Sequence, residues 1–446
     1  MNERILQLLS GDAKDLAQLR GEIVTEKSID IALLFEKTNK EESLRLFRLL
    51  PKNMSADIFA LISADIQQSI VEGLTDNEIS LITNELFVDD LVDFIEELPP
   101  IVVTRVLNSV DVDKRLIVNE ILRYPKDSAG SVMTTEFIQL PDNHTVRQAM
   151  YDIRETGMDK ETIYTCYVVD PDSRLIGQVN ADTLIHADPH QLIIEVMDGN
   201  VLSVSTSDDR EVVVGLFSRY GLIAVPVVDN EGLLVGIVTI DDVMHIIDEE
   251  TTEDFEKMAA LNPSDDPYFK TGVFKQARNR IGWLMLLMLS DTINGSVIAS
   301  YENSLAVLPI LVAFIPMLMG AGGNASAQAS TVIIRGLALD EITFKDLAKV
   351  IWKEVRVGLA CGFTLGLANF IRIFLMNGRD AVLSLVVTSS LLLGIVFAKT
   401  LGCLLPIGAK KLRLDPAVMA APILTTIVDF ATLIIYFLVA KLVYHI

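Results

Sequence analysis

The chain has 446 residues, of which 50% are hydrophobic, and its formal net charge is −23. Residues 271–446 hold 15 Lys and Arg against 9 Asp and Glu, a net of +6, so residues 1–270 hold the other 22 and 51, a net of −29. Nucleic-acid-binding surfaces are basic, so the acidic part excludes nucleic acid as a partner and fits cation binding, although a solvated surface that aids solubility has the same composition.

Residues 1–125 carry apolar residues at helical spacing, for example in ADIFALI (56–62) and DLVDFIEEL (90–98). The segment RLLP (48–51) returns as EELP (96–99), each time before another short helical pattern. We therefore expect an acidic, α-helical, superhelical repeat domain. Its first residues lack the apolar segment of a secretory signal, which predicts a cytosolic location. Three cysteines without a C-x-x-C pair predict neither a zinc site nor a disulfide framework.

Residues 126–250 are rich in strand-forming residues and contain an internal repeat. The segment VVDPDSRLIGQVNADTLI (168–185) matches VVDNEGLLVGIVTIDDVM (227–244), and SVMTTEFIQL (131–140) matches EVMDGNVLSV (195–204). Each unit predicts a strand, a glycine-containing turn, a second strand and a helix. The pair resembles a tandem of CBS domains, a regulatory α/β module.

CBS domains often bind adenine nucleotides, and a Thr or Ser followed three residues later by Asp tends to hold the ribose. In this sequence the resemblance implies such a pair at Thr239 and Asp242, whereas Asn180 and Thr183 occupy the equivalent places in the first unit. We therefore expect at most one site for ATP or another adenine nucleotide. A structural role for the CBS pair without nucleotide is equally open.

Residues 251–275 read as a connecting helix that Asn-Pro and Asp-Pro pairs interrupt, and residues 276–446 form an all-α transmembrane domain. Five apolar runs in this last domain are long enough to span a bilayer, near 281–301, 305–334, 357–376, 381–407 and 417–443. We therefore expect a multi-domain protein of the cell membrane with the lipid bilayer as a partner.

The basic residues gather on one side of the five predicted spans. Before the first span, between the second and third, and between the fourth and fifth stand Lys275, Arg278, Arg280, Arg335, Lys345, Lys349, Lys353, Arg356, Lys410, Lys411 and Arg413. The other two loops hold only Glu302 and the pair Arg379 and Asp380. The positive-inside rule then places the N-terminus in the cytoplasm and the C-terminus outside.

A single carboxylate, Asp429, interrupts the apolar segment LTTIVDFATLIIYFLV (424–439). Its helical spacing places it on one face with Ala421, Thr425 and Thr432. A charge in the bilayer costs at least ~2.5–3.5 kcal/mol, so such residues are usually functional. We interpret Asp429 as a cation site in a transport pathway, the alternative being a structural Asp that a neighbouring helix hydrogen-bonds.

The segment GAGGNASAQAS (320–330) in the second run is too small and polar to face lipid. Asn324 and Gln328 are four residues apart, so their amides point the same way, and such hard oxygen donors suit a hydrated divalent cation. Close helix packing at small residues is the alternative, and it is the favoured interpretation of Gly358, Gly362 and Gly366 in the third run.

Few other ionisable residues lie in the spans. Asp291 stands in the first, and Arg372 and Lys399 are expected near helix ends, where they reach the interface. This leaves little for a proton relay. The sequence contains no P-loop and no recognisable catalytic triad, so an enzyme is not predicted.

The order of these parts resembles the MgtE family of magnesium channels and transporters over nearly the whole chain. GGNASAQ (322–328) is similar to the family's G-G-N-x-G-x-Q, with Ser326 at the third glycine, and DPAVMAAPILTTIVD (415–429) is similar to its D-P-A…P…T-x-x-D pattern. The resemblance implies a homodimer with a pore on the two-fold axis. It implies Mg²⁺ as substrate, Asp429 as the selectivity carboxylate, and Asn324 and Thr425 beside it.

The family also implies closure by cytosolic Mg²⁺, which binds between the N-domain, the CBS pair and a plug helix. The candidate ligands by position are Asp57, Asp89 and Asp93 in the N-domain, Asp209, Glu211 and Asp242 in the CBS pair, Glu250, Glu253 and Asp254 at the plug helix, and Asp415 at the membrane border. His245 and Gly221 stand where some relatives have acidic residues, so the sensing affinity is expected to differ.

Two alternatives remain beside a Mg²⁺-selective channel. One is a less selective or ion-coupled divalent cation transporter, and the other is a membrane-tethered CBS nucleotide sensor that transports nothing. The second would not need the polar stripe around Asp429. The first predicts that Mg²⁺ flux depends on a second ion gradient.

Overall fold

The structure, a computed structural model, describes residues 19–21, 23–264, 268–269, 271–339, 341–378, 380–412, 414–419 and 421–445. Arg379 and Arg413, which contribute to the predicted membrane orientation, lie outside these residues, as do residues 1–18 of the predicted repeat domain. The chain divides into two compact units, Met1–Ile247 and Asp248–Ile446, which we call the N-terminal and C-terminal units.

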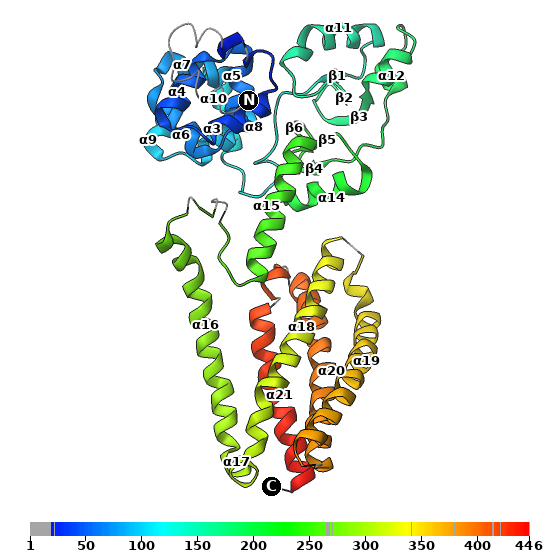
Figure 1. Ribbon diagram of the computed structural model, residues 1–446. Helices are drawn as coiled ribbons and strands as arrows, with labels where there is room; N and C mark the ends of the chain where they lie inside the picture. Colours follow the sequence, from blue (N-terminus) through cyan, green and yellow to red (C-terminus); the bar gives the residue numbers. More distant parts are fainter. Residues whose placement is uncertain are drawn as a thin grey trace. The chain divides into compact units, whose positions relative to one another are not determined.

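The N-terminal unit begins with short helices of nearly equal length (Figure 1). They are α3 (Ser28–Phe35), α4 (Lys40–Leu49), α5 (Lys52–Leu61), α6 (Ala64–Gly73), α7 (Asp76–Glu85), α8 (Val88–Glu96), α9 (Pro100–Ser109) and α10 (Val112–Ile121). Each of these helices starts twelve residues after the one before it. Helices two places apart pack together, as α3 does with α5 and α7 with α9. This arrangement confirms the predicted helical repeat.

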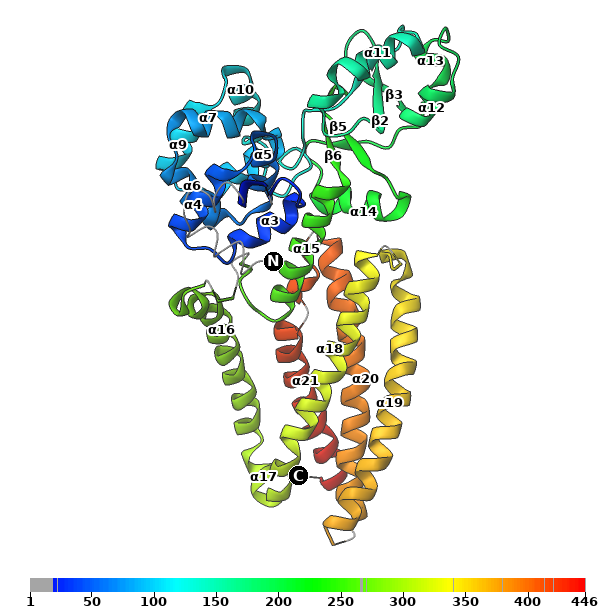
Figure 2. The same ribbon diagram turned by 45° about the horizontal axis from the view of Figure 1, so that its top comes forward.

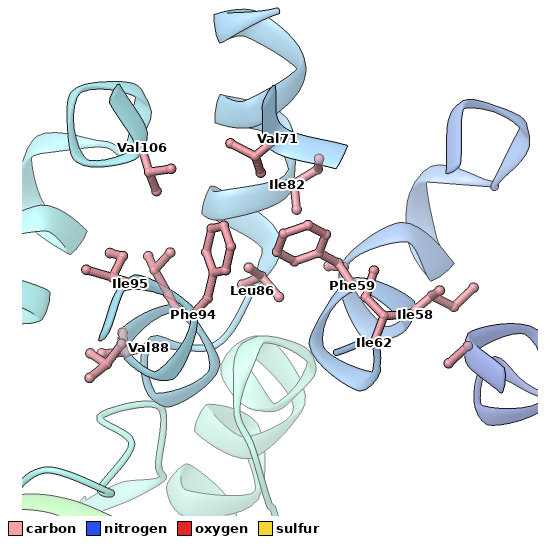
Figure 3. Close-up of a cluster of buried hydrophobic side chains, with 14 of the residues drawn as sticks. Ile58, Phe59, Ile62, Val71, Ile82, Leu86, Val88, Phe94, Ile95 and Val106 are labelled. Carbon is pink, nitrogen blue, oxygen red and sulfur yellow. The ribbon is translucent and has the colours of Figure 1, made fainter. Parts of the chain in front are cut away.

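Buried aliphatic residues at the helix ends carry this period. They are Leu50, Ile62, Leu74, Leu86, Leu98 and Val110. Capping boxes at Asn39 and Thr75 fix two of the starts by satisfying amides that the first helical turn leaves without partners. Between the helices, Phe59 packs edge to face against Phe94 at 4.9 Å between ring centroids (Figure 3). The repeat is therefore a superhelix around one continuous apolar core.

The second half of the N-terminal unit contains two three-stranded sheets with strand orders β1-β2-β3 and β4-β5-β6. The strands are β1 (Gln139–Pro141), β2 (Thr165–Val169), β3 (Leu175–Asn180), β4 (Val204–Ser205), β5 (Ala224–Val228) and β6 (Leu234–Thr239). The helices are α11 (Val146–Thr156), α12 (Ala181–His186), α13 (Ile193–Val196) and α14 (Arg210–Tyr220), with a 3₁₀ turn, η1 (Gly157–Asp159). Helix α15 (Ile240–Met258) begins in this unit, and its residues from Asp248 on belong to the C-terminal unit.

Both sheets have the same pairing, parallel for the first two strands and antiparallel for the last two. Each motif also reaches into the other, because Met133 contacts Gly236 and Met197 contacts Gly177. A side chain at either glycine would collide with the methionine. The predicted internal repeat is thus confirmed as a pseudo-symmetric pair of CBS motifs.

Among the described residues of the C-terminal unit, five helices are long and apolar enough to cross a membrane (Figure 2). They are α16 (Val273–Ser300), α18 (Ile315–Ala338), α19 (Leu347–Met376), α20 (Ala381–Lys411) and α21 (Ala421–Tyr444). Shorter elements are α17 (Glu302–Val307), η2 (Pro309–Phe314), η3 (Phe344–Asp346) and η4 (Ala417–Met419). Helices α18, α20 and α21 pack mutually, α19 packs against α20, and α16 packs against α21.

Glycines set the closest helix contacts of this unit. A Cβ atom on Gly358 or Gly362 would lie 3.1 or 3.3 Å from a backbone Cα atom of α20. These distances are shorter than ordinary van der Waals contacts. The packing interpretation of Gly358, Gly362 and Gly366 in α19 is therefore confirmed.

Candidate cation sites

Asp429 lies within α21 opposite two glycines of α18. A Cβ atom on Gly323 would lie 4.0 Å from Asp429 Oδ1 and 3.5 Å from Thr425 Cγ2. One on Gly322 would lie only 2.9 Å from Thr432 Oγ1, which leaves no room for a side chain. The glycine pair therefore allows α18 to approach the polar face of α21. Asp429 is half-buried and has no hydrogen-bond donor among the described residues.

The polar segment of α18 has two different faces. Asn324 and Gln328 are exposed in the single chain, on the same face of the helix. Ser326 is fully buried, and its hydroxyl donates to the Gly323 carbonyl at 2.8 Å. A Cβ atom on Gly402 would lie 2.5 Å from the Ser326 carbonyl oxygen, so α18 and α20 touch here. The serine thus fits without disturbing the amide face.

A lysine that the sequence analysis missed lies between the carboxylates at the end of α15. The Lys257 ammonium lies 2.5 Å from Glu253 Oε1 and 2.7 Å from Asp415 Oδ2. The other oxygen of Asp415 accepts the Ala417 amide at 2.7 Å. The structure therefore brings two of the predicted plug ligands, Glu253 and Asp415, together around an internal cation.

The neighbouring carboxylate, Asp254, is less well compensated. Burial and then repulsion by Asp415 raise the pKa of Asp254 to about 6, and Glu250 adds a smaller repulsion. Burial by itself lowers the pKa of Lys257, but its bonds to Asp415 and Glu253 outweigh that effect and raise it. This site gathers the carboxyl groups of Glu253, Asp254 and Asp415 around the one ammonium group of Lys257.

A second group of carboxylates lies in the N-terminal unit, where α8 meets the start of α15. Asp89 is 7% exposed, and burial, followed by repulsion from Asp242, raises its pKa well above the usual range. Burial and then Asp242 raise the pKa of Asp90 to about 6, with a smaller contribution from Asp57. Burial and nearby aspartates raise the pKa of Glu161 to about 8. These groups repel one another, and a bound cation would relieve the repulsion.

The remaining predicted ligands occupy simpler positions. Asp209 caps α14 by accepting the Glu211 amide at 2.9 Å, which places both at the start of that helix. Asp93 is exposed on α8. Within the described ranges, no group of three or more His, Cys, Asp or Glu side chains is arranged to hold a metal ion. A cation in either acidic group would therefore draw side chains together and would not enter a preformed cage.

The predicted nucleotide pair is present at the end of β6. The Thr239 hydroxyl lies 2.6 Å from Asp242 Oδ2 and 2.5 Å from Asp241 Oδ1, so it donates to one of these two carboxylates. Burial raises the pKa of Asp242 to about 6, although the bonds from Thr239 oppose this. The pair expected to hold the ribose therefore lies beside a further carboxylate, that of Asp241.

The expectation that Lys399 lies near a helix end is wrong. It lies inside α20, is 5% exposed, and pairs with Glu354 of α19 at 3.7 Å between Nζ and Oε2. Its burial follows from the packing of α19 against α20. Arg372 does lie near the end of α19, as expected, and it donates to Asn369 at 2.8 Å on the same helix.

Sequence reasoning missed three groups: Lys257, Glu161 and the Glu354–Lys399 pair. Lys257 carried a usable signal, because it follows Glu253 by four residues on a helix. Lys399 stands within an apolar run, whereas Glu354 stands between Lys353 and Arg356, and nothing in the sequence pairs the two charges. No local pattern marked Glu161.

Family descriptions match three parts of the chain. A divalent cation transporter family, MgtE, matches residues 315–439, the intracellular N domain of MgtE matches residues 27–127, and CBS domains match residues 129–190 and 193–249. Curated proteins called magnesium transporter MgtE are similar over almost the whole chain. That of Thermus thermophilus is 34% identical over 98% of this chain and 96% of its own length. That of Bacillus subtilis is 30% identical over 99% and 96%.

Two solved structures resemble the N-terminal half. The cytosolic domain of the Mg²⁺ channel MgtE, crystallised in complex with ATP, is 32% identical, with a TM-score of 0.53, and the match covers 55% of this chain and 100% of that domain. The soluble part of a magnesium transporter is 29% identical, with a TM-score of 0.52, over 56% of this chain and 98% of that structure.

Proposed function

The chain belongs to the MgtE family of magnesium transporters, and we propose that it conducts Mg²⁺ through a membrane pore lined by α18 and α21, with Asp429 as the selecting carboxylate. The observation that carries this proposal is the position of Asp429. It faces the glycine pair of α18 and has no hydrogen-bond donor among the described residues. Such a carboxylate in an apolar helix is costly unless it meets water or a cation.

We propose that the pore lies on the two-fold axis of a homodimer. Asn324 and Gln328 are exposed in the single chain, and lipid is a poor environment for amides. A second copy or an aqueous path would satisfy them. A two-fold axis brings like residues together, so two Asp429 carboxylates would repel unless a divalent cation lay between them. Mg²⁺ loses its water reluctantly, which favours a wide site that contacts the hydration shell.

Replacing Asp429 tests this role directly. In proteoliposomes, Asp429→Ala and the nearly isosteric Asp429→Asn should abolish Mg²⁺ uptake, while size-exclusion chromatography shows an assembly of parental size. Glu302→Gln, an exposed carboxylate of the same unit, should conduct like the parent. Near-parental uptake by a well-folded Asp429 variant would refute the proposal.

We propose that cytosolic Mg²⁺ closes the channel through the acidic group around Asp89 and Asp242. The support is electrostatic, because carboxylates that repel one another in a buried place gain most from a divalent cation, and oxygen donors are those that Mg²⁺ prefers. A shift from 1:99 to 99:1 needs about 5.5 kcal/mol of differential binding, which several weak sites can supply together. Limited proteolysis within residues 250–270 should slow as Mg²⁺ rises, and a pattern indifferent to Mg²⁺ would contradict the switch.

The plug contact is proposed as the last link of closure. Glu253 and Asp415 share the Lys257 ammonium, and Asp254 lies beside them with a raised pKa. Mg²⁺ would add the positive charge that this group lacks. Changing Glu253 and Asp254 together to Ala should give a channel that conducts at Mg²⁺ concentrations that silence the parent. If inhibition is unchanged, these carboxylates only favour the helix, and the gate lies elsewhere.

Ion coupling and nucleotide binding are separate questions for this chain. The buried Glu354–Lys399 pair adds an ionisable group to the membrane domain, so Mg²⁺ flux should be measured with and without a proton gradient. For the nucleotide, Thr239 and Asp242 are the residues that would hold the ribose. Loss of ATP binding in Thr239→Val would support this role, and unchanged binding would contradict it.

A further inference from the structure

Helix α19 carries a row of basic residues on the side that faces away from its packing partner, α20. Lys349, Lys353 and Arg356 follow one another at intervals of four and three residues, which places them on one face of the helix. Gly358, whose missing side chain lets α20 approach, stands nine residues after Lys349, or about two and a half turns, and so lies on the opposite face. In both views α19 lies at the edge of the C-terminal unit, beside α20 (Figures 1 and 2).

Most of the charge in this row has no ionic partner. All three side chains are exposed. Lys349 pairs with Asp346 at 3.1 Å, whereas Glu354, another carboxylate of this part of the chain, is engaged in the buried ion pair with α20. No carboxylate among the described residues forms an ion pair with Lys353 or Arg356. These two cations therefore face outward from the helix without a counter-ion from the chain.

The length of the helix places the row at the border of the bilayer. The apolar part of α19 lies between Arg356 and Arg372, about 24 Å apart along the axis, and both side chains can reach outward from a hydrocarbon layer of about 30 Å. Lys353 then lies about 5 Å and Lys349 about 11 Å beyond Arg356 along the axis. The headgroup layer is about 5–8 Å thick on each side, so it contains the charges of Arg356 and Lys353.

Exposed aromatic rings mark the same end of the helix. Trp352 is 62% exposed, and the Arg356 guanidinium lies 5.7 Å from the centre of its ring. Phe344, just before the helix, is 47% exposed and carries the Lys411 ammonium at 4.0 Å. Tryptophan is enriched at membrane interfaces, where its ring lies at the level of the headgroups. The positive-inside rule counts charges and requires neither a shared face nor a tryptophan, so membrane orientation alone does not explain this arrangement.

We propose that Lys353, Arg356 and Trp352 bind the headgroup of an anionic phospholipid in the leaflet at the N-terminal end of α19. The two cations would donate hydrogen bonds to the phosphodiester, since Arg and Lys both bind phosphate oxygens. Phe363 and Leu367 follow Arg356 by seven and eleven residues on the same face and are 66% and 53% exposed, so they offer a surface for one acyl chain. This lipid site is separate from the proposed ion path.

Quenching of Trp352 by brominated lipids tests the site in the full chain. The chain has two tryptophans, so a Trp283→Phe background leaves Trp352 as the emitter. The host vesicles are phosphatidylcholine, doped with phosphatidylglycerol or phosphatidylcholine whose acyl chains carry bromine. Brominated phosphatidylglycerol should half-quench Trp352 at a mole fraction about tenfold lower than brominated phosphatidylcholine, a factor that corresponds to about 1.4 kcal/mol. The preference should shrink at 1 M salt, where the Debye length is only about 3 Å.

Paired substitutions distinguish a lipid site from general attraction to an anionic membrane. Lys353→Gln combined with Arg356→Gln should reduce the preference to about twofold or less, whereas Arg356→Lys, which keeps the charge, should retain most of it. Arg278→Gln combined with Arg280→Gln removes the same charge from exposed positions of α16 and is the matched control. This control should keep the parental preference. Variants are compared after size-exclusion chromatography shows an assembly of parental size.

Three outcomes would refute the site. The first is equal quenching of the parent by the two brominated lipids. The second is a loss of preference in the α16 control as complete as that in the Lys353 and Arg356 pair, which would show that the attraction is general. The third is abolition of the preference by millimolar inorganic phosphate, which would show that the cations bind phosphate from solution. Mg²⁺ uptake enters none of these measurements, so the role of Asp429 stands or falls separately.

Discussion

The buried ion pair between α19 and α20 gives the sharpest stability prediction. The side chains of Lys399 and Glu354 are 7% and 13% exposed, and their charged atoms lie 3.7 Å apart. At an effective dielectric constant of about 20, Coulomb's law gives an attraction of about 4–5 kcal/mol at this distance. Desolvation of the two ions cancels much of that, so the pair contributes little net stability, but each partner depends strongly on the other.

We therefore expect the single replacements to be much worse than the double one. Lys399→Met leaves Glu354 as a buried, unpaired carboxylate and should cost about 3–5 kcal/mol. Since 1 kcal/mol corresponds to roughly 2–4 °C for a unit of about 200 residues, the apparent Tm should fall by about 6–20 °C. Glu354→Gln should be similarly harmful. The double variant should melt near the parent, because it leaves no unpaired charge.

Thermal melting of the full chain in detergent measures the four corners of this cycle. The exposed pair of Lys349 and Asp346, at 3.1 Å on the same end of α19, is the matched control. Lys349→Met should shift the melting temperature by no more than about 2 °C, because exposed ion pairs are worth 0–1 kcal/mol. If Lys399→Met melts like the Lys349 control, or if the double variant is as unstable as the singles, the reasoning is wrong.

Three further predictions concern other parts of the chain. Asp89→Asn should raise the apparent Tm without Mg²⁺, because burial raises the pKa of Asp89 and makes its ionised form unfavourable in the fold. Asp113 is exposed, so Asp113→Asn should leave the apparent Tm unchanged. Glu78 is about a third exposed, and hydrogen bonds from Thr75 and Arg48 lower its pKa to about 2. Its ionised form therefore stabilises the fold above pH 4.5, and this stabilisation is lost as the pH falls towards 2. Glu78→Gln should lower the free energy of unfolding by about 1 kcal/mol at pH 7, as measured by hydrogen exchange of α7. Gly402→Val should lower the Tm by several degrees because its side chain would meet backbone at 2.5 Å, whereas Gly408→Val, with open space, should be much milder.

The N-terminal repeat shows what a sequence reveals and what it hides. The segments ending at Pro51 and Pro99 are 48 residues apart, and this spacing is four periods of the twelve-residue repeat. Proline precedes the helix at these two starts, whereas Thr75 and Asp111 precede other helices. The match between RLLP and EELP therefore identified two helices that are four repeats apart and missed the repeats between them. The period lies in buried residues at equivalent positions of successive helices, such as Leu50, Ile62 and Leu74, and ordinary helical spacing conceals it.

The membrane site was predictable where a residue contradicts its surroundings. Asp429 and Asn324 interrupt apolar helices, and their chemistry alone marks them. Glu354 stands between Lys353 and Arg356, so it does not contradict its surroundings, and its importance depends on Lys399, which follows 45 positions later in another helix. The sequence contains both charged residues but not the distance between them. From the sequence, a lysine that reaches the membrane interface cannot be distinguished from a lysine in a buried ion pair.

The carboxylates of the C-terminal unit can be divided by how the fold treats them. Glu354 has a lysine partner, Asp380 accepts the amides of Val382 and Leu383 at the start of α20, and Asp415 is held by Lys257. A structural carboxylate is thus given a cation or a donor from the chain itself. Asp429 has neither among the described residues, although an unpaired charge at membrane depth costs at least ~2.5–3.5 kcal/mol. The fold compensates the neighbouring carboxylates and leaves Asp429 uncompensated, which favours a partner from solution. Asp429 is an oxygen anion beside amide and hydroxyl groups, so this partner is a hard divalent cation.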